Sequence, residues 1–165
     1  RRERVQTRVT YGLFKWLLQG GKHVASEVNI FENTLETVLL AIMEEGLPNI
    51  VHVVRGESDK VELLPLCSVT TTELEEEIYQ SGIYRATVEF TLKDDLDKGS
   101  PTESAELFAE VLDLLQNPDL KAEMNDNPTI FIHGIVLGTQ RASEIGDRMW
   151  IKSVSCEFFG YAVAS

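Results

Sequence analysis

The alternation of apolar and polar residues between Ile83 and Lys93 constrains the fold more than any other feature of this sequence. One face of the segment would carry Tyr84, Ala86, Val88, Phe90 and Leu92. The other face would carry Arg85, Thr87, Glu89, Thr91 and Lys93. Because side chains in a strand point alternately to opposite faces, this period of two predicts a half-buried β-strand.

A helix start signal follows this strand. The residues from Asp94 to Gly99 have the composition of a loop, and Ser100 after them suits the N-cap position. Pro101 suits the first helical position, and Glu103 completes a capping box with Ser100. The apolar stripe of the helix would consist of Phe108, Val111, Leu112 and Leu115. Asn117–Pro118–Asp119 predicts the end of this helix and the start of a short second one.

Another main helix is expected earlier in the chain. Asn33 and Glu36 form a start resembling a capping box, and Gly46 fits the position just beyond the last turn. The buried stripe of this helix would consist of Leu35, Val38, Leu39, Ile42 and Met43.

Further segments have the composition of strands. They are Asn49–Arg55, Val61–Thr71, Thr129–Leu137 and Met149–Val163. Pro65 in the second segment predicts an edge position or a bulge. The third has apolar residues on both faces, which predicts a central strand covered on both sides. The third and fourth would form a long hairpin, with Gly160 as a candidate bulge. The acidic run Glu73–Glu77 is expected to be a solvated loop or one helical turn.

These elements predict an α+β fold, with an antiparallel β-sheet of about four to five strands and two main helices packed on it. An extended N-terminal arm is expected to precede the sheet. The predicted division is a basic arm with a short apolar segment over residues 1–30 and a single α+β domain over residues 31–165. Since no run of about 18 apolar residues occurs, no membrane-spanning helix is predicted.

Charge is distributed unevenly along the chain, whose formal net charge is −12. Residues 1–27 hold six basic side chains and two acidic ones, a net +4, so the remainder carries −16. An acidic body repels phosphate, which argues against nucleic-acid binding by the body itself. The arm could touch phosphates, or it could be a solvated or partner-docked tail.

The arm consists of a basic part and an apolar part. The basic part contains Arg1, Arg2, Arg4 and Arg8, and the apolar part contains Leu13, Phe14, Trp16, Leu17 and Leu18. A segment this short is unstable as an isolated helix, so it is expected to pack on the body, on a neighbouring copy or on a membrane surface. Packing within the protein or on a partner is favoured, because a membrane anchor needs a longer amphipathic helix. We therefore expect the arm to dock on an acidic neighbouring subunit or on an adjoining protein assembly.

No recognised catalytic or metal-binding arrangement occurs in the sequence. The histidines are His23, His52 and His133. They lie in different predicted elements without metal-ligand spacing, which favours structural roles. Asp95, Asp97 and Glu106 partly match a calcium loop, but Gly99 falls one place early, so a solvated turn is favoured. We predict no catalytic residue, no metal and no cofactor.

Cys67 and Cys156 are far apart and form no CxxC pair. Buried thiols in a reducing compartment are the favoured interpretation, because free cysteine is among the most buried residue types. Spacing alone leaves a disulfide open.

The order of the predicted elements resembles the small tail-terminator (tail-completion) proteins of long-tailed phages. The resemblance extends from Asn33 to Val163, without the N-terminal arm. Its most specific parts are the helix end Leu114–Leu120 and the turn Gly146–Trp150 that opens the last strand. The chain departs from the pattern at the start of the long helix, where such proteins often carry histidine and this chain has Glu103 or Ser104.

The resemblance implies a structural virion protein that assembles in the host cytoplasm into a ring, typically a hexamer, at the head-proximal end of the tail tube. Such a ring stops tube growth and joins the tail to the head connector. The implied partners are neighbouring copies, the tail tube protein and head–tail connector or adaptor proteins. DNA passes through without specific binding, and no membrane is involved.

Two groups of residues are candidates for these contacts. Candidates for an acidic lumen or rim are Asp94, Asp95, Asp97, Glu73, Glu75, Glu76 and Glu77. Candidates for docking through the arm are Arg1, Arg2, Arg4, Arg8, Phe14, Trp16 and Leu17. The alternative for the acidic group is a surface that only aids solubility.

Other functions remain open. The same α+β fold class would suit a head-completion or other neck ring protein, or a tail tube subunit. A small enzyme with an unrecognised site is a different class of alternative. That alternative requires His52 or His133 to lie beside a carboxylate in a cleft.

Overall fold

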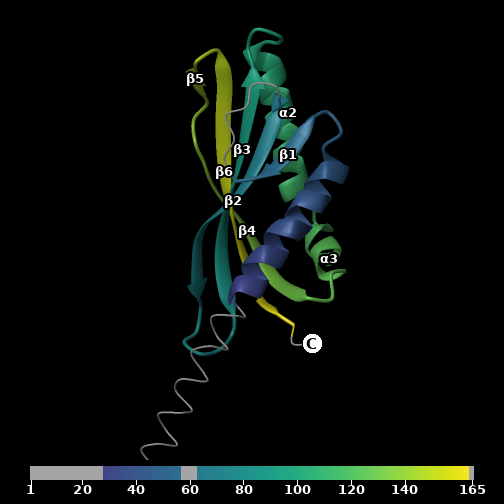
Figure 1. Cartoon of the computed structure of the whole chain (residues 1–165), viewed down its shortest axis with the longest axis vertical. Coiled ribbons are helices and arrows are strands. Elements are labelled where there is room, and N and C mark those ends of the chain that lie inside the picture. Colours follow the sequence, from purple (N-terminus) through teal and green to yellow (C-terminus); the bar gives the residue numbers. More distant parts are fainter. Residues whose placement is uncertain (1–27, 57–62, 164–165) are drawn as a thin grey trace, which may run out of the picture.

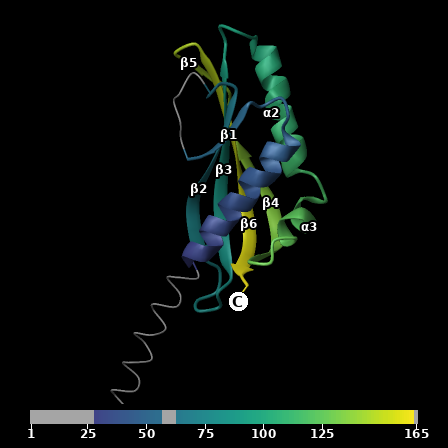
Figure 2. The same ribbon diagram turned by 45° about the vertical axis from the view of Figure 1, so that its right-hand side comes forward.

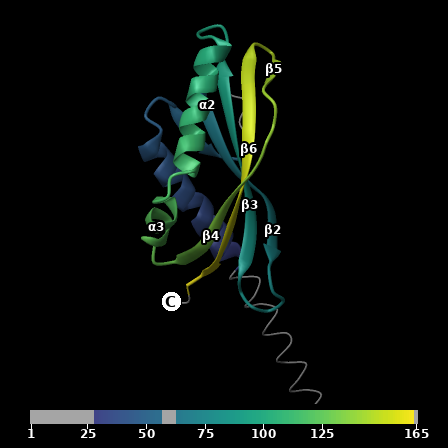
Figure 3. The ribbon, with the colours of Figure 1, turned by 180° about the vertical axis from the view of Figure 1, so that it is seen from behind.

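The computed structural model describes residues 28–56 and 63–163, in which three helices cover one face of a twisted β-sheet (Figure 1). Figure 2 shows the helix over residues 28–46 crossing in front of the strands. Seen from behind in Figure 3, the helices again lie to one side of the sheet. The predicted α+β class is confirmed, while residues 1–27 of the predicted arm lie outside the described residues.

The sheet is mixed and largely antiparallel. Its strands are β1 (His52–Arg55), β2 (Leu66–Glu76), β3 (Tyr84–Asp95), β4 (Ile130–Gln140), β5 (Glu144–Gly146) and β6 (Met149–Ala162). The spatial order is β1-β2-β3-β6-β4, and β5 pairs with β6 beyond the end of β4. The prediction of a purely antiparallel sheet is wrong in one place, because β1 runs parallel to β2. The remaining pairs are antiparallel.

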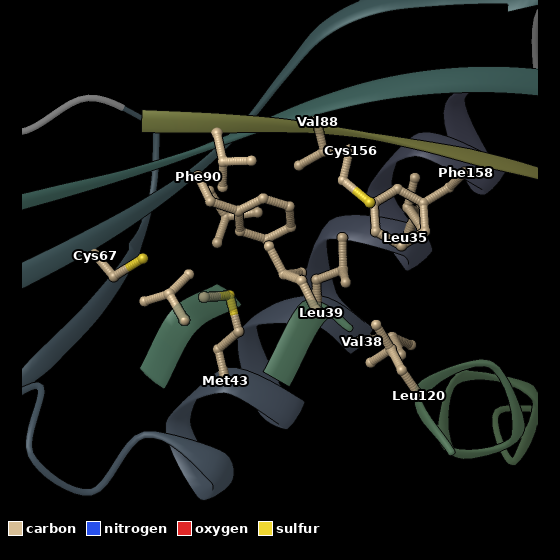
Figure 4. Packing of buried hydrophobic residues seen from close by; sticks show 14 of the residues in the cluster. Leu35, Val38, Leu39, Met43, Cys67, Val88, Phe90, Leu120, Cys156 and Phe158 are labelled. Carbon is tan, nitrogen blue, oxygen red and sulfur yellow. The ribbon is translucent and has the colours of Figure 1, made fainter. Parts of the chain in front are cut away.

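The predicted alternation in β3 is confirmed. Buried and half-buried residues alternate along the whole strand from Tyr84 to Asp95. Its buried side chains meet those of β6 and of helix 28–46, and Figure 4 shows Phe90, Cys156 and Leu39 in this core. Because β3 pairs with β2 on one side and β6 on the other, it lies at the centre of the sheet.

The predicted capped helix is confirmed as α2 (Pro101–Leu115), followed by the short helix α3 (Leu120–Asn125). Glu103 N–H donates to Ser100 Oγ at 3.3 Å, and Ser100 N–H donates to Glu103 Oε2 at 2.8 Å. Phe108 and Val111 are buried on the side that faces the sheet. These reciprocal bonds satisfy backbone donors that the first turn would otherwise leave unpaired.

The predicted start of the earlier helix at Asn33 is wrong. The helix already includes residue 28, so the expected domain boundary after residue 30 falls within it. The Asn33 carbonyl accepts a hydrogen bond from Thr37 Oγ1 at 2.7 Å, as in a helix interior. Its side chain accepts one from Arg55 Nη2 at 2.6 Å. The polar group that suggested an N-cap therefore contacts β1 instead.

Three strand predictions also require correction. The segment predicted to be central is β4, which lies at the edge, and its Phe131 and Val136 are exposed. The acidic run from Glu73 to Glu76 continues strand β2, because it pairs with β3 across a bulge after Thr71. Pro65 precedes β2, with a cis peptide bond from Leu64.

The long hairpin of the last two main strands is confirmed, since β4 and β6 pair antiparallel. The bulge lies in β4 at His133, opposite Gly160, rather than at the glycine itself. A Cβ at Gly160 would lie 2.2 Å from the carbonyl oxygen of Phe131, so the close approach of the two strands requires glycine.

Candidate functional site

The acidic residues nominated for a lumen or rim lie near opposite ends of β3. The glutamates of β2 extend to Glu76, which is paired with Tyr84 at the start of β3. Asp94 and Asp95 are the last residues of β3. At about 3.3 Å per residue, the strand spans about 33 Å between Tyr84 and Asp94. The structure therefore does not gather these acidic residues into one patch within a single copy.

Asp94 is buried and is not part of an exposed acidic surface in the single chain. It is 8% exposed, and Ser104 Oγ donates to its Oδ2 at 2.7 Å. The backbone N–H of Asp95 donates to Asp94 Oδ1 at 2.8 Å. The predicted start of the loop at Asp94 is wrong, because β3 continues to Asp95. The alternation of the strand places Asp94 on the face toward the helices. Asp94 thus connects the end of β3 to the first turn of α2.

Asp95 and Asp97 organise the connection that follows β3. Asp97 N–H donates to Asp95 Oδ1 at 2.9 Å, and Arg148 Nη1 lies 3.5 Å from Asp97 Oδ2. Across residues 28–56 and 63–163, no group of three or more His, Cys, Asp or Glu is placed to hold a metal ion.

The glutamates at the other end lie on β2 and the turn after it. Glu75 pairs with Arg85 of β3, and both the hydrogen bond to Glu75 and its charge raise the pKa of the Arg85 guanidinium above its usual range. Glu76 Oε1 accepts a hydrogen bond from Gly82 N–H at 2.9 Å. Glu73 and Glu77 are exposed. This end of the sheet therefore presents carboxylates to solvent next to an unpaired stretch of strand.

The two described histidines lie on opposite margins of the sheet. His52 lies in β1 and lines a recess of about 260 Å³ together with Glu44, among aliphatic residues. His133 lies in the bulge of the edge strand β4, with its ring 6.1 Å from that of Phe159. His23 lies outside the described residues. The recess at His52 is smaller than the range of about 300–1,000 Å³ usual for small-molecule sites.

The two cysteines are free and buried, as predicted. Burial raises the pKa of the Cys67 thiol to about 12. Burial, with a further contribution from the charge of Glu157, raises the pKa of Cys156 to about 12 as well. Since the thiolate is the reactive form, both side chains act as apolar core residues rather than nucleophiles.

The two margins of the sheet differ in chemistry. On one side β1 covers only Leu66–Val69 of β2, so Thr70–Glu76 has no strand partner there among the described residues. On the other side, β4 carries no charged residue between Ile130 and Gln140. One open edge is therefore acidic, and the other is uncharged and partly apolar.

An exposed aromatic cluster on β4 and β6 was not predicted from the sequence. The rings of Phe131 and Tyr161 lie 5.4 Å apart and are 41% and 38% exposed. Phe159 and His133 lie beside them in the strand register. The signal available in the sequence was the alternation of Phe131 and His133 with Ile130 and Ile132, which reads as two different faces.

The predicted docking residues of the arm, from Arg1 to Leu17, lie outside the described residues. None of the described helices is long and apolar enough to cross a membrane. Comparison of the sequence with protein-family models and with curated proteins gives no match.

Proposed function

We propose that this chain is a ring-forming structural protein of a long-tailed phage, located at the head-proximal end of the tail tube. In this proposal the ring, typically a hexamer, ends tube growth and joins the tail to the head connector. The order of elements from helix 28–46 to β6 supports the proposal through its resemblance to tail-terminator proteins.

The observation that carries the proposal is the difference between the two open edges of the sheet. A ring with cyclic symmetry joins one surface of each copy to a different surface of the next copy. The uncharged edge of β4 and the acidic edge of β2 are two such surfaces. Open strand edges bind other chains readily through backbone N–H and C=O groups that have no strand partner. Two residues on these edges already bond to side chains: Ile132 of β4 to Asn125, and Thr71 of β2 to Glu36.

Charge supports the same role. Every copy brings a formal net charge of −12, and an acidic ring would let DNA pass without holding its phosphates. Of the acidic candidates, Glu73 and Glu77 are exposed at one end of the sheet and Asp97 at the other. We expect one of these ends to face the channel.

A neck or head-completion ring would use the same edges, whereas a tail tube subunit would polymerise by itself into long tubes. His52 and Glu44 line one recess together. A recess of about 420 Å³ at His133 has no carboxylate among its described lining residues, so the enzyme alternative depends on the recess at His52. Its small volume and aliphatic lining favour a structural role for that region.

Location on the particle tests the proposal. Tagged protein is mixed with purified tails and particles, and bound gold label is imaged by electron microscopy. Label at one end of the tube, at the head junction, is the expected result. Label along the whole tube would favour a tube subunit, and absence of binding to any particle would overturn the phage assignment.

A pair of substitutions tests the role of the edge. Val136→Lys places a charge on the exposed side of β4, where Val136 is 50% exposed. Because a charged edge strand resists pairing, ring formation should fall by at least about tenfold in sedimentation experiments. Ile30→Lys is the matched control, since Ile30 is 45% exposed on helix 28–46 rather than on a strand edge, and it should leave assembly unchanged. Equal effects of both substitutions would remove β4 from the interface.

A further inference from the structure

A groove lies between the C-terminal half of helix 28–46, the C-terminal half of α2, and α3. Its volume is about 830 Å³. The side chains that line it include Ile42, Leu114 and Leu120, which provide apolar surface. At one point the two long helices are so close that a Cβ on Gly46 would lie 2.3 Å from Leu114 Cδ1. The groove is therefore formed by packed helices rather than by loops alone.

The rest of the groove lining is strongly acidic. Carboxylates line it at Glu45, Glu110, Asp113, Glu123 and Asp126. No lysine or arginine occurs among its described lining residues. The carboxylate of Glu110 accepts a hydrogen bond from Asn49 Nδ2 at 2.9 Å. Like charges that line one groove repel one another, and a cationic occupant would relieve that repulsion.

Helix ends add to the negative potential. Helix 28–46 and α2 both end at the groove, and the C-terminus of a helix carries a partial negative charge. Neither α2 nor α3 has a basic residue in its last turn, where one would normally compensate this charge. The groove thus lacks the cations that its helix ends favour.

We infer that this groove binds the N-terminal segment, residues 1–27, of a neighbouring copy of the same chain. This inference rests on the proposed ring. The segment carries a net +4 against a body of −16, and its arginines at positions 1, 2, 4 and 8 match the carboxylates of the groove. Its apolar residues Leu13, Phe14 and Trp16 match the apolar surface at Ile42, Leu114 and Leu120.

Chain length favours a neighbouring copy over the same copy. Residue 28 is the first described residue of helix 28–46, and the groove lies at the other end of these residues, about 27 Å away at 1.5 Å per residue. Ten residues along the chain separate Leu18 from residue 28, and a chain of that length spans at most about 33–36 Å. Reaching its own groove would therefore require the segment to stretch back along its own helix. A groove on the next copy in a ring carries no such constraint.

Cross-linking between full-length copies tests this contact. One tagged copy carries Arg8→Cys and a differently tagged copy carries Glu123→Cys, and a short bismaleimide joins the pair. The natural thiols of Cys67 and Cys156 are buried, so they can stay in place. Glu144→Cys on β5 is the matched control, because Glu144 is also an exposed carboxylate. We expect at least about tenfold more cross-linked heterodimer with Glu123→Cys than with the control.

Equal yields at both positions would overturn the inference. Placing Arg8→Cys and Glu123→Cys in a single chain tests the intramolecular alternative. A product that remains monomeric would show that the segment binds its own groove, which also overturns the inference.

Charge reversal provides an independent test. Asp113→Lys with Glu123→Lys should lower ring assembly at low salt by at least about tenfold, and Arg4→Glu with Arg8→Glu should do the same. Mixing the two reversed proteins should restore part of the assembly, because each then offers the charge that the other lacks. If reversal is without effect while rings still form at the tube end, the groove inference fails and the proposed function stands. If the unmodified protein forms no rings and binds no particle, both fail.

Discussion

The two faces of the central strand β3 differ in what holds their side chains. On the covered face, Val88 and Phe90 are 0% exposed and pack against β6 and helix 28–46, as Figure 4 shows. On the open face, Thr87, Glu89 and Thr91 remain partly exposed. The contacts there are between partly exposed side chains, such as the Arg85–Glu75 pair and the 3.7 Å approach of Arg141 Nη2 to Glu89 Oε2.

Because of this difference, the residues that stabilise the fold lie on the covered face, and the residues available for assembly lie on the open face and the edges. Apolar burial on the covered face provides most of the free energy of folding. The open face and the edges contribute little to folding, so their residues are available for contacts with other copies. Substitutions on the covered face should therefore lower folding stability more than substitutions on the open face. Equal losses on the two faces would contradict this comparison.

The largest effect is expected at Phe90. Phe90→Ala removes a fully buried ring and should lower the free energy of unfolding by about 3–5 kcal/mol. Thr91→Val, one residue along on the open face, should change it by less than about 1 kcal/mol. Chemical denaturation followed by circular dichroism measures both values. Similar losses at the two positions would mean that the open face is covered in the native protein.

A smaller effect is expected where a polar contact is buried on the covered face. Ser104→Ala leaves Asp94 Oδ2 without the donor that lies 2.7 Å away, and should cost about 1–3 kcal/mol. Ser155→Ala on the open face removes only a long 3.4 Å contact to the Thr139 carbonyl, so it should cost less than about 0.5 kcal/mol. The same denaturation experiment checks this pair, and equal costs would contradict the burial of the Asp94–Ser104 bond.

The features predicted well from the sequence are those encoded by nearby residues. The alternation of β3 and the capping box at Ser100 depend on neighbours within a few positions, so they could be read directly. The end of α2 and the start of α3 around Asn117–Asp119 are of the same kind.

The features that could not be predicted depend on distant partners. The parallel pairing of His52 with Leu66 joins segments whose order in the sheet no local pattern reveals. The edge position of β4 was hidden because Phe131 and Val136 look like buried residues until their lack of a cover is known. The acidic groove brings together Glu45, Asp113 and Glu123 from separate helices, which no spacing in the sequence indicates.

Alkaline pH should lower the free energy of unfolding through the buried thiol of Cys67. Burial raises the pKa of Cys67 from 9.0 to about 12, so the unfolded state releases this proton at lower pH than the folded state. Stability contributed by the protonated thiol is complete below about pH 9 and is lost as pH rises toward 12. By about pH 9.5 the loss should be about 1 kcal/mol relative to Cys67→Ala, measured by denaturation at each pH. Parallel pH profiles for the two proteins would contradict burial of the thiol.

The smallest effect is expected at the ion pair of Arg141 with Glu89 on the open face. Arg141 is largely exposed and its guanidinium is 3.7 Å from Glu89, so solvent and salt screen their attraction. Arg141→Ala should lower the Tm by less than about 2 °C at low salt. The difference should vanish in about 1 M NaCl, where the Debye length is about 3 Å. A loss that persists in salt would show that Arg141 stabilises the sheet by packing its aliphatic stem over Ser153, whose carbonyl accepts the Arg141 N–H at 3.0 Å. In that case this part of the open face would belong to the folded core rather than to the surface that is free for assembly.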